Sequence, residues 1–161
     1  MTERTLYQID FDVRFSARYH HLCERMFLTM NDATTFLSLI FGSGAVIAIL
    51  QQSTIVTVAM AFIVALANAI NLTVGYVRKA YVHRDLYRRY QELAAEISAT
   101  TPQPANAESA YLKIERDDPP IIESMRKIAQ IENLRTNGHS EEISRPELKL
   151  SCREKLLRML L

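Results

Sequence analysis

Four side chains with metal-ligating chemistry lie in two short stretches of the sequence. They are His20, His21 and Cys23, followed much later by His83. If two helices bring these stretches together, imidazole and thiol groups would face each other, as they do at zinc sites. No carboxylate or second thiol stands at ligand spacing beside them, and the other cysteine is Cys152. We therefore expect no bound metal and no other cofactor, and we expect both thiols to be reduced.

A second motif matches known catalytic chemistry only in part. His83-Arg84-Asp85-Leu86 resembles a fragment of a protein-kinase catalytic loop. The glycine-rich loop, the metal-binding Asn and the DFG triplet are missing, and 161 residues are too few for a kinase. No nucleophile with a base, no paired carboxylates and no basic array with interleaved aromatic residues can be assembled. The sequence predicts a protein that is not an enzyme and that binds no nucleic acid.

The chain is dominated by an uncharged stretch. From Ala33 to Val77 there is no Asp, Glu, Lys or Arg, and a polar knot divides it into spans over 33–51 and 54–77. At about 1.5 Å rise per residue, each span is long enough to cross the roughly 30 Å hydrocarbon core of a bilayer. Two buried helices of a soluble all-α domain are the alternative, but such helices normally expose a polar stripe. We predict an all-α membrane protein that contains a two-helix transmembrane hairpin.

The charges around this stretch predict how it crosses the membrane. The connector around Gln52 is very short, so the two spans must be antiparallel and both chain ends must share one side. The connector has no Lys or Arg, whereas basic residues crowd after the second span: Arg78, Lys79, Arg84, Arg88 and Arg89. Such an excess marks the cytoplasmic side. The first thirty residues show no cleavable signal peptide. We predict a multi-pass protein in the lipid bilayer of the bacterial inner membrane, with both termini cytoplasmic.

Small and polar side chains inside the spans are the candidate functional groups. Small residues let helices approach closely in lipid, and polar side chains there need partners. The candidates for pore lining or interhelical packing are Ser38, Gly42, Ala65, Asn68, Asn71 and Gly75. Asn68 and Asn71 either form interhelical hydrogen bonds, worth about 0.6 kcal/mol on average, or line a water-filled path in a homo-oligomer. Both roles place them on the protein-facing side of the second span.

Amphipathic helices precede and follow the spans. One is expected from Val13 to Met30, and the other continues from Arg78 to Ser98 without a helix breaker. We expect them to pair as a cytoplasmic stalk through Phe15, Tyr19, Leu22 and Met26 on the first helix and Val82, Leu86, Tyr90 and Leu93 on the second. A basic face formed by Arg14, Arg18, His21 and Arg25 either faces water or lies on anionic headgroups.

The chain divides into four predicted segments. Residues 1–12 are a polar lead-in, 13–98 the hairpin with its stalk, 99–110 a linker that contains Pro102 and Pro104, and 111–161 a cytoplasmic helical tail. Within the second segment, Asn31 and Asp32 are suited to cap the helix of the first span.

Residues 11–98 resemble the SLATT family, the two-span effector domains of bacterial conflict and phage-defence systems. The resemblance rests on the approach RFSARYHHLCERMF, the spans FLSLIFGSGAVIAIL and ALANAINLTVGYV, and the exit helix RKAYVHRDLYRRYQELAAEI. It implies an oligomeric inner-membrane effector, pore-forming or membrane-disrupting, that halts the infected cell in abortive defence. It also implies a trigger, either from a separate sensor or nucleotide-signal protein or read by residues 99–161, which the resemblance does not cover.

Two other functions fit the same pattern. One is a non-catalytic membrane-anchored adaptor, such as a prophage exclusion factor, which acts through its cytoplasmic helices. The other is a holin-like protein, although the long tail fits that function less well. A single hairpin is too thin to enclose a channel, so a pore requires several copies of the chain.

Overall fold

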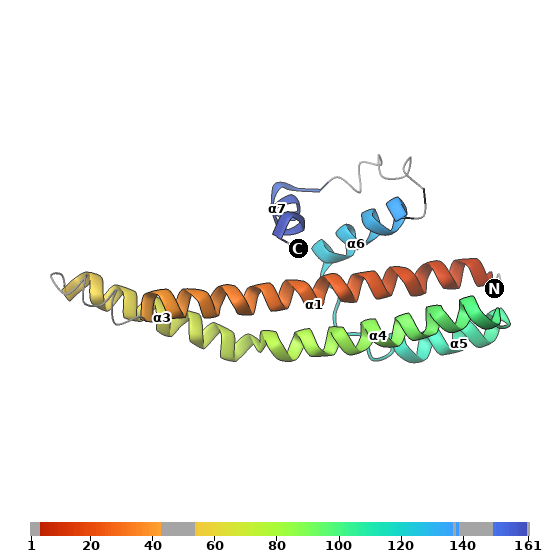
Figure 1. The fold of residues 1–161 in the computed structure, drawn as a ribbon, viewed down its shortest axis with the longest axis horizontal. Helices are drawn as coiled ribbons and strands as arrows, with labels where there is room; N and C mark the ends of the chain where they lie inside the picture. The colour runs from red at the N-terminus through yellow and green to blue at the C-terminus, as the bar shows by residue number, and fades with distance from the viewer. Residues whose placement is uncertain (1–3, 43–53, 137, 139–149, 161) are drawn as a thin grey trace. The chain divides into compact units, whose positions relative to one another are not determined.

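The computed structural model describes residues 4–42, 54–136, 138 and 150–160, and within these ranges it is helical and contains no strand. Figure 1 shows the helices, whose bounds are α1 Leu6–Gly42, α3 Thr54–Val74, α4 Tyr76–Thr100, α5 Pro104–Glu115, α6 Glu123–Thr136 and α7 Cys152–Leu160. The all-α prediction is confirmed for this part of the chain.

The chain forms two compact units, and the division falls inside the predicted segment 13–98. Met1–Arg25 and Tyr81–Leu161 make up one of them, which we call the terminal unit because it holds both chain ends. Met26–Ala80 make up the other, the middle unit.

The terminal unit has a core of the kind found in water-soluble helical proteins. Buried side chains recur at helical spacing on α1, at Ile9, Val13 and Ala17. They pack with Leu86, Tyr90, Leu93, Ala94 and Ile97 of α4 and with Ala107, Tyr111 and Ile114 of α5. Helix α6 buries Met125, Ile128, Ala129, Ile131 and Leu134. Tail residues therefore complete the packing of the two stalk helices.

Two helices in the terminal unit begin with a capping box, in which two residues three apart bond each other's backbone. At the start of α1 the Thr5 hydroxyl accepts from the Gln8 N–H, and the Gln8 side chain accepts from the Thr5 N–H at 2.9 Å. Ser151 and Glu154 do the same before α7. The predicted lead-in over 1–12 is therefore wrong from Leu6 onward, because the capped helix already buries Ile9.

The predicted linker over 99–110 is much shorter in the structure. Helix α4 continues to Thr100, and Thr101 ends it in the left-handed region at φ 43°. Helix α5 then begins at Pro104, whose fixed φ and missing N–H suit a first helical position. The two prolines predict a linker, but one of them, Pro104, starts a helix.

The prediction of a helix start at Asn31 and Asp32 is wrong. Helix α1 passes through both residues, so they cap no helix start. The helix expected from Arg78 to Ser98 is confirmed, because it lies unbroken within α4, and Gly75, whose φ of +62° is left-handed, separates α4 from α3. The Gly75 N–H still donates to the Asn71 carbonyl at 2.9 Å, and its carbonyl accepts from the Lys79 N–H at 3.1 Å. Glycine adopts this conformation without the steric penalty that a Cβ brings.

In the middle unit, α1 and α3 lie antiparallel. Ser38 contacts Asn68, whereas the earlier residue Asn31 contacts the later residue Asn71. The two helices therefore run in opposite directions. One helical stretch among the described residues, Val58–Thr100, is long and apolar enough to cross a membrane by length and composition. Of the predicted first span, residues 43–51 lie outside the described residues.

Candidate functional site

Polar side chains of the middle unit meet between its two helices. The Ser38 hydroxyl donates to the Asn68 side-chain oxygen at 3.0 Å, and the Asn71 amide contacts the Asn31 side-chain oxygen at 3.4 Å. Both asparagines that were predicted to face protein therefore have a partner on α1. These contacts join residues 30 and 40 positions apart, so they tie the two helices together.

The other candidates in the spans have different surroundings. Ala65 is exposed on α3. Gly75 forms the left-handed junction between α3 and α4. Gly42 is the last residue of α1, and its packing lies outside what the structure describes.

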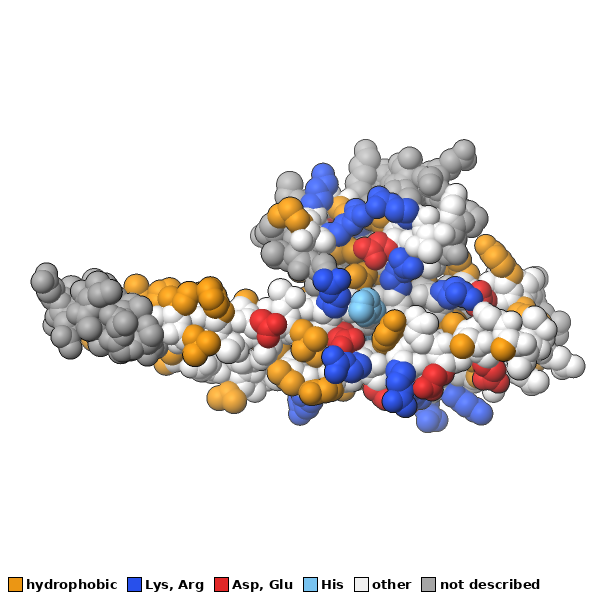
Figure 2. Space-filling model, in the orientation of Figure 1, with side chains coloured by type: hydrophobic (Ala, Val, Ile, Leu, Met, Phe, Trp, Pro, Cys, Tyr) orange, Lys and Arg blue, Asp and Glu red, His pale blue; other side chains and the backbone are white. Residues whose placement is uncertain are grey.

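Large apolar side chains cover the outside of the middle unit. The exposed ones are Met30, Phe36, Leu37, Leu39 and Ile40 on α1 and Val58, Phe62, Ile63, Leu66, Ile70 and Leu72 on α3. Leu66 and Leu72 point about 120° apart around their helix, so the surface is not a single stripe. Figure 2 shows hydrophobic side chains along α3 without Lys or Arg among them, whereas charged side chains gather over the terminal unit. Patches of this kind mark contact with protein or lipid.

The predicted stalk residues are mostly buried. Tyr19, Leu22 and Met26 on α1 and Leu86, Tyr90 and Leu93 on α4 are each less than a tenth exposed, and Phe15 is partly buried. Val82 is 44% exposed and does not belong to this face. The buried face of α4 instead includes His83, one residue and about 100° further around the helix. An imidazole thus occupies the place that was predicted for an aliphatic side chain.

His83 is buried because it belongs to a polar cluster that joins α1, α4 and the turn between α5 and α6. The Nδ1 atoms of His20 and His83 lie 2.8 Å apart, a hydrogen-bond distance. His20 stacks on Tyr90 with the ring centroids 5.5 Å apart. Asp118, from the turn, accepts from the Tyr90 hydroxyl at 3.1 Å, and its other oxygen lies 3.3 Å from His20 Nε2. That last pair falls outside hydrogen-bond angles, so it is an electrostatic contact.

Neutral hydroxyl and thiol groups surround the imidazoles. The Tyr19 hydroxyl accepts from the Ile122 N–H at 2.9 Å, which fixes the start of the segment that leads into α6. Burial raises the pKa of the Tyr19 hydroxyl and raises the pKa of the neighbouring Cys23 thiol to about 12. Burial, together with the Asp118 charge, also raises the pKa of Tyr90. Cys23 is therefore a protonated, unreactive thiol at neutral pH.

The structure brings together only part of the histidine and cysteine set that was weighed for metal binding. His20, His83 and Cys23 share the buried cluster, but His21 is exposed and packs against Tyr87. Among the described residues, no three His, Cys, Asp or Glu side chains are grouped so that they could hold a metal ion.

Sequence reasoning missed Asp118 and Glu24. Glu24 is 7% exposed and accepts from the Arg84 side chain at 2.6 Å, and this contact raises the pKa of Arg84. Glu24 and Arg84 stand sixty residues apart, and Asp118 sits in a turn between two helices. No local periodicity marks either acid. Glu24 has its role from the pairing of α1 with α4, and Asp118 has its role from the packing of the turn between α5 and α6 on these two helices.

Comparisons with known proteins do not assign the chain to a family. No protein-family model matches the chain, and neither a curated protein nor a solved structure resembles it at a significant level.

Proposed function

We propose that this chain is an oligomeric inner-membrane effector that acts by breaching or disrupting the membrane. The observation that carries the proposal is the exposed apolar surface of the middle unit, within a stretch that lacks any Asp, Glu, Lys or Arg. In water, such a surface would drive aggregation, whereas lipid solvates it. The place of this effector in anti-phage abortive defence rests on the SLATT resemblance.

Self-association follows from the size of the middle unit. Two helices cannot enclose a water-filled path, so a conduit needs several copies of the chain. The small and polar stripe around Ala65 and Asn68 is the surface on which copies would meet. Both residues are exposed, Ala65 offers close approach, and the Asn68 amide nitrogen is not the atom that contacts Ser38. The terminal unit would remain on the cytoplasmic side, together with both chain ends.

The first experiment measures leakage. Purified full-length protein is added to vesicles of phosphatidylethanolamine and phosphatidylglycerol that contain a self-quenching dye. We expect dye release that rises more steeply than linearly with protein concentration, as an oligomer requires. A confirmed oligomer that releases no dye under any tested trigger would contradict the pore.

A double substitution tests the role of the polar stripe. Asn68→Leu with Asn71→Leu removes both amides, and we expect leakage and cell toxicity to fall while membrane association persists. Thr73→Val is the matched control, because the Thr73 hydroxyl bonds the Ala69 carbonyl of its own helix at 2.8 Å. Full leakage by the double variant would show that the asparagines only hold the helices together.

A second function is favoured by one specific observation. Both asparagines already have partners on α1 within a single copy, as expected of packing contacts in a membrane-anchored adaptor. An adaptor would act through the terminal unit, where α5 and α6 complete a folded helical body. Deleting residues 121–161 then abolishes activity, whereas the double asparagine substitution leaves it intact.

A further inference from the structure

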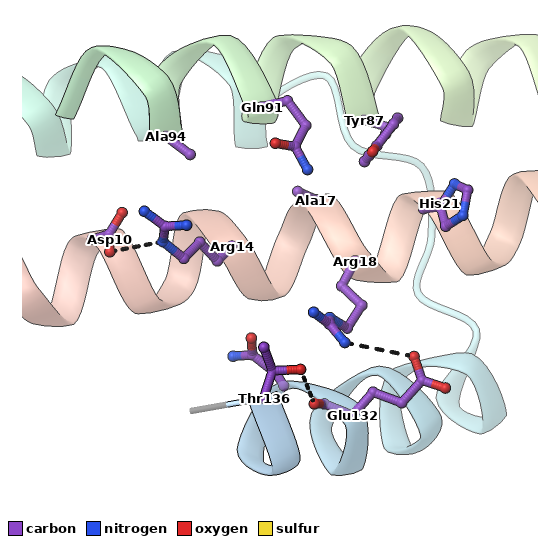
Figure 3. A pocket seen from close by; sticks show the side chains of 11 residues that line it. Asp10, Arg14, Ala17, Arg18, His21, Tyr87, Gln91, Ala94, Glu132 and Thr136 are labelled. Atoms are coloured by element: carbon purple, nitrogen blue, oxygen red, sulfur yellow. Dashed lines mark hydrogen bonds and ion pairs between the residues drawn. The ribbon is translucent and has the colours of Figure 1, made fainter. Parts of the chain in front are cut away.

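A polar pocket in the terminal unit is not used by the proposed function. It has a volume of about 580 Å³ and lies between α1, α4 and α6 (Figure 3). Its hollow forms where the small side chains Ala17 and Ala94 stand among longer ones. The volume falls within the roughly 300–1,000 Å³ that is typical of small-molecule sites, but the wall is mainly polar. A ligand that matches this wall must itself be polar.

The basic face of α1 supplies the cations of the pocket. Arg14 and Arg18 stand one turn apart and both line the wall, as does His21. Like charges at this spacing repel each other, and an anion between them would relieve that repulsion. The arginines thus line a hollow within a folded unit.

The two guanidinium groups differ in how firmly they are held. Arg14 donates through Nε to Asp10 at 2.9 Å and through Nη2 to Ser98 at 3.0 Å. Arg18 lies 3.9 Å from the Glu132 carboxylate of α6, which is longer than a hydrogen bond. Arg14 is therefore positioned by its neighbours, while the contact of Arg18 with Glu132 is weak.

The wall contributed by α4 offers a different chemistry. Tyr87 and Gln91 project from α4 toward α1, as Figure 3 shows. The Tyr87 ring lies 5.0 Å from the His21 ring, centroid to centroid. An aromatic face beside an amide suits a planar group with hydrogen-bonding edges.

We propose that this pocket binds a small phosphorylated organic molecule with a planar ring. The phosphate oxygens accept from Arg14 and Arg18, since guanidinium groups present paired donors that match phosphate geometry. The ring lies against Tyr87, beside Gln91. Of the two carboxylates in the wall, Asp10 is paired with Arg14, and the phosphate takes the place of Glu132 at Arg18. Binding thereby removes an ionic contact between α1 and α6, so α6 is held less firmly against α1 when the pocket is occupied.

Phenyl phosphate is the probe, because it carries both a phosphate and a ring and nothing else. Titration of full-length protein in detergent micelles by calorimetry should give a Kd at or below about 1 mM. Benzoate, which replaces the phosphate by a single carboxylate, should bind at least about tenfold more weakly. Absence of phenyl phosphate binding at about 10 mM would overturn the proposal, and equal binding of benzoate would overturn the phosphate assignment.

Three variants locate the binding. Arg18→Gln should weaken phenyl phosphate binding about tenfold or more, whereas Glu132→Gln should strengthen it because the competing carboxylate is gone. Arg88→Gln is the matched control, since Arg88 is on α4, is 76% exposed and lies outside the pocket. Tighter binding by Glu132→Gln cannot come from misfolding. If Glu132→Gln and Arg18→Gln both bind phenyl phosphate with unchanged affinity, the probe binds elsewhere and the proposed site is overturned. Because micelles replace the bilayer, this result is independent of leakage.

Discussion

The terminal and middle units arrange their polar and apolar side chains in opposite ways. In the terminal unit Leu86 and Tyr90 are fully buried, and arginines such as Arg88 extend into solvent. In the middle unit Leu66 and Phe62 are on the outside, while Ser38 and Asn68 turn toward each other. A helix pair whose large apolar side chains face outward suits a solvent less polar than water. Two solvents for one chain, as we propose, account for this contrast, and each prediction below tests that proposal.

The largest effect is expected when a leucine is truncated to alanine in the core of the terminal unit. The same truncation in the middle unit is the comparison. Leu86→Ala removes a side chain that is 1% exposed in the core, so we expect the terminal unit to lose about 2–5 kcal/mol of unfolding free energy. Leu66→Ala, at a position that is 50% exposed, should change that free energy by less than about 0.5 kcal/mol. Denaturant titration in detergent, followed by near-ultraviolet circular dichroism of the tyrosines, measures both. Similar losses for the two variants would contradict the contrast.

A charge placed on the apolar surface should have a comparable effect on insertion. Leu66→Arg would cost about 2.5–3.5 kcal/mol near the bilayer centre. We expect much of this variant to leave the membrane fraction during an alkaline wash. Tyr81→Arg, at an exposed position of the terminal unit, should stay with the membrane like the unchanged protein. If the Leu66 variant is retained equally well, water and not lipid surrounds α3.

The smallest effect at neutral pH concerns the buried hydroxyl and thiol groups. Folding raises the pKa of Cys23, Tyr19 and Tyr90, so the folded protein holds these protons more tightly than the unfolded chain. Their stabilising contribution is complete below about pH 9 and is lost as the pH rises further. In a Cys152→Ser background, iodoacetamide at pH 9 should therefore label Cys23 slowly in the folded protein and rapidly in denaturant. Equal rates would mean that the thiol is not buried.

Periodicity made the helices and most of the stalk predictable. Heptad-like spacing identified Leu86, Tyr90 and Leu93 as a seam, and these side chains are buried. The same reasoning assigned Val82 to that seam because Val82 is aliphatic and His83 is polar. In the structure His83, and not Val82, completes the buried face. A buried imidazole is stable only beside the correct partner, and His20 is supplied by another helix.

Helix ends were less predictable than helix interiors. Thr5 and Gln8 carry a capping-box signal, so the start of α1 is predictable from the sequence. Gly75 is different, because a glycine in an apolar run looks the same whether it permits close packing or a left-handed turn. Asp118 lay beyond sequence reasoning altogether, since its partners are on α1 and α4.

The contact between His20 and His83 gives the two buried rings different hydrogen-bonding roles. With their Nδ1 atoms 2.8 Å apart, one nitrogen must carry a hydrogen and the other must offer a lone pair. Each ring therefore depends on a group that another helix supplies, and replacing either imidazole by an aliphatic side chain would leave the other ring buried without this hydrogen bond. Such a loss would loosen α1 from α4 at this point, although Leu86 and Ile97 remain in the core.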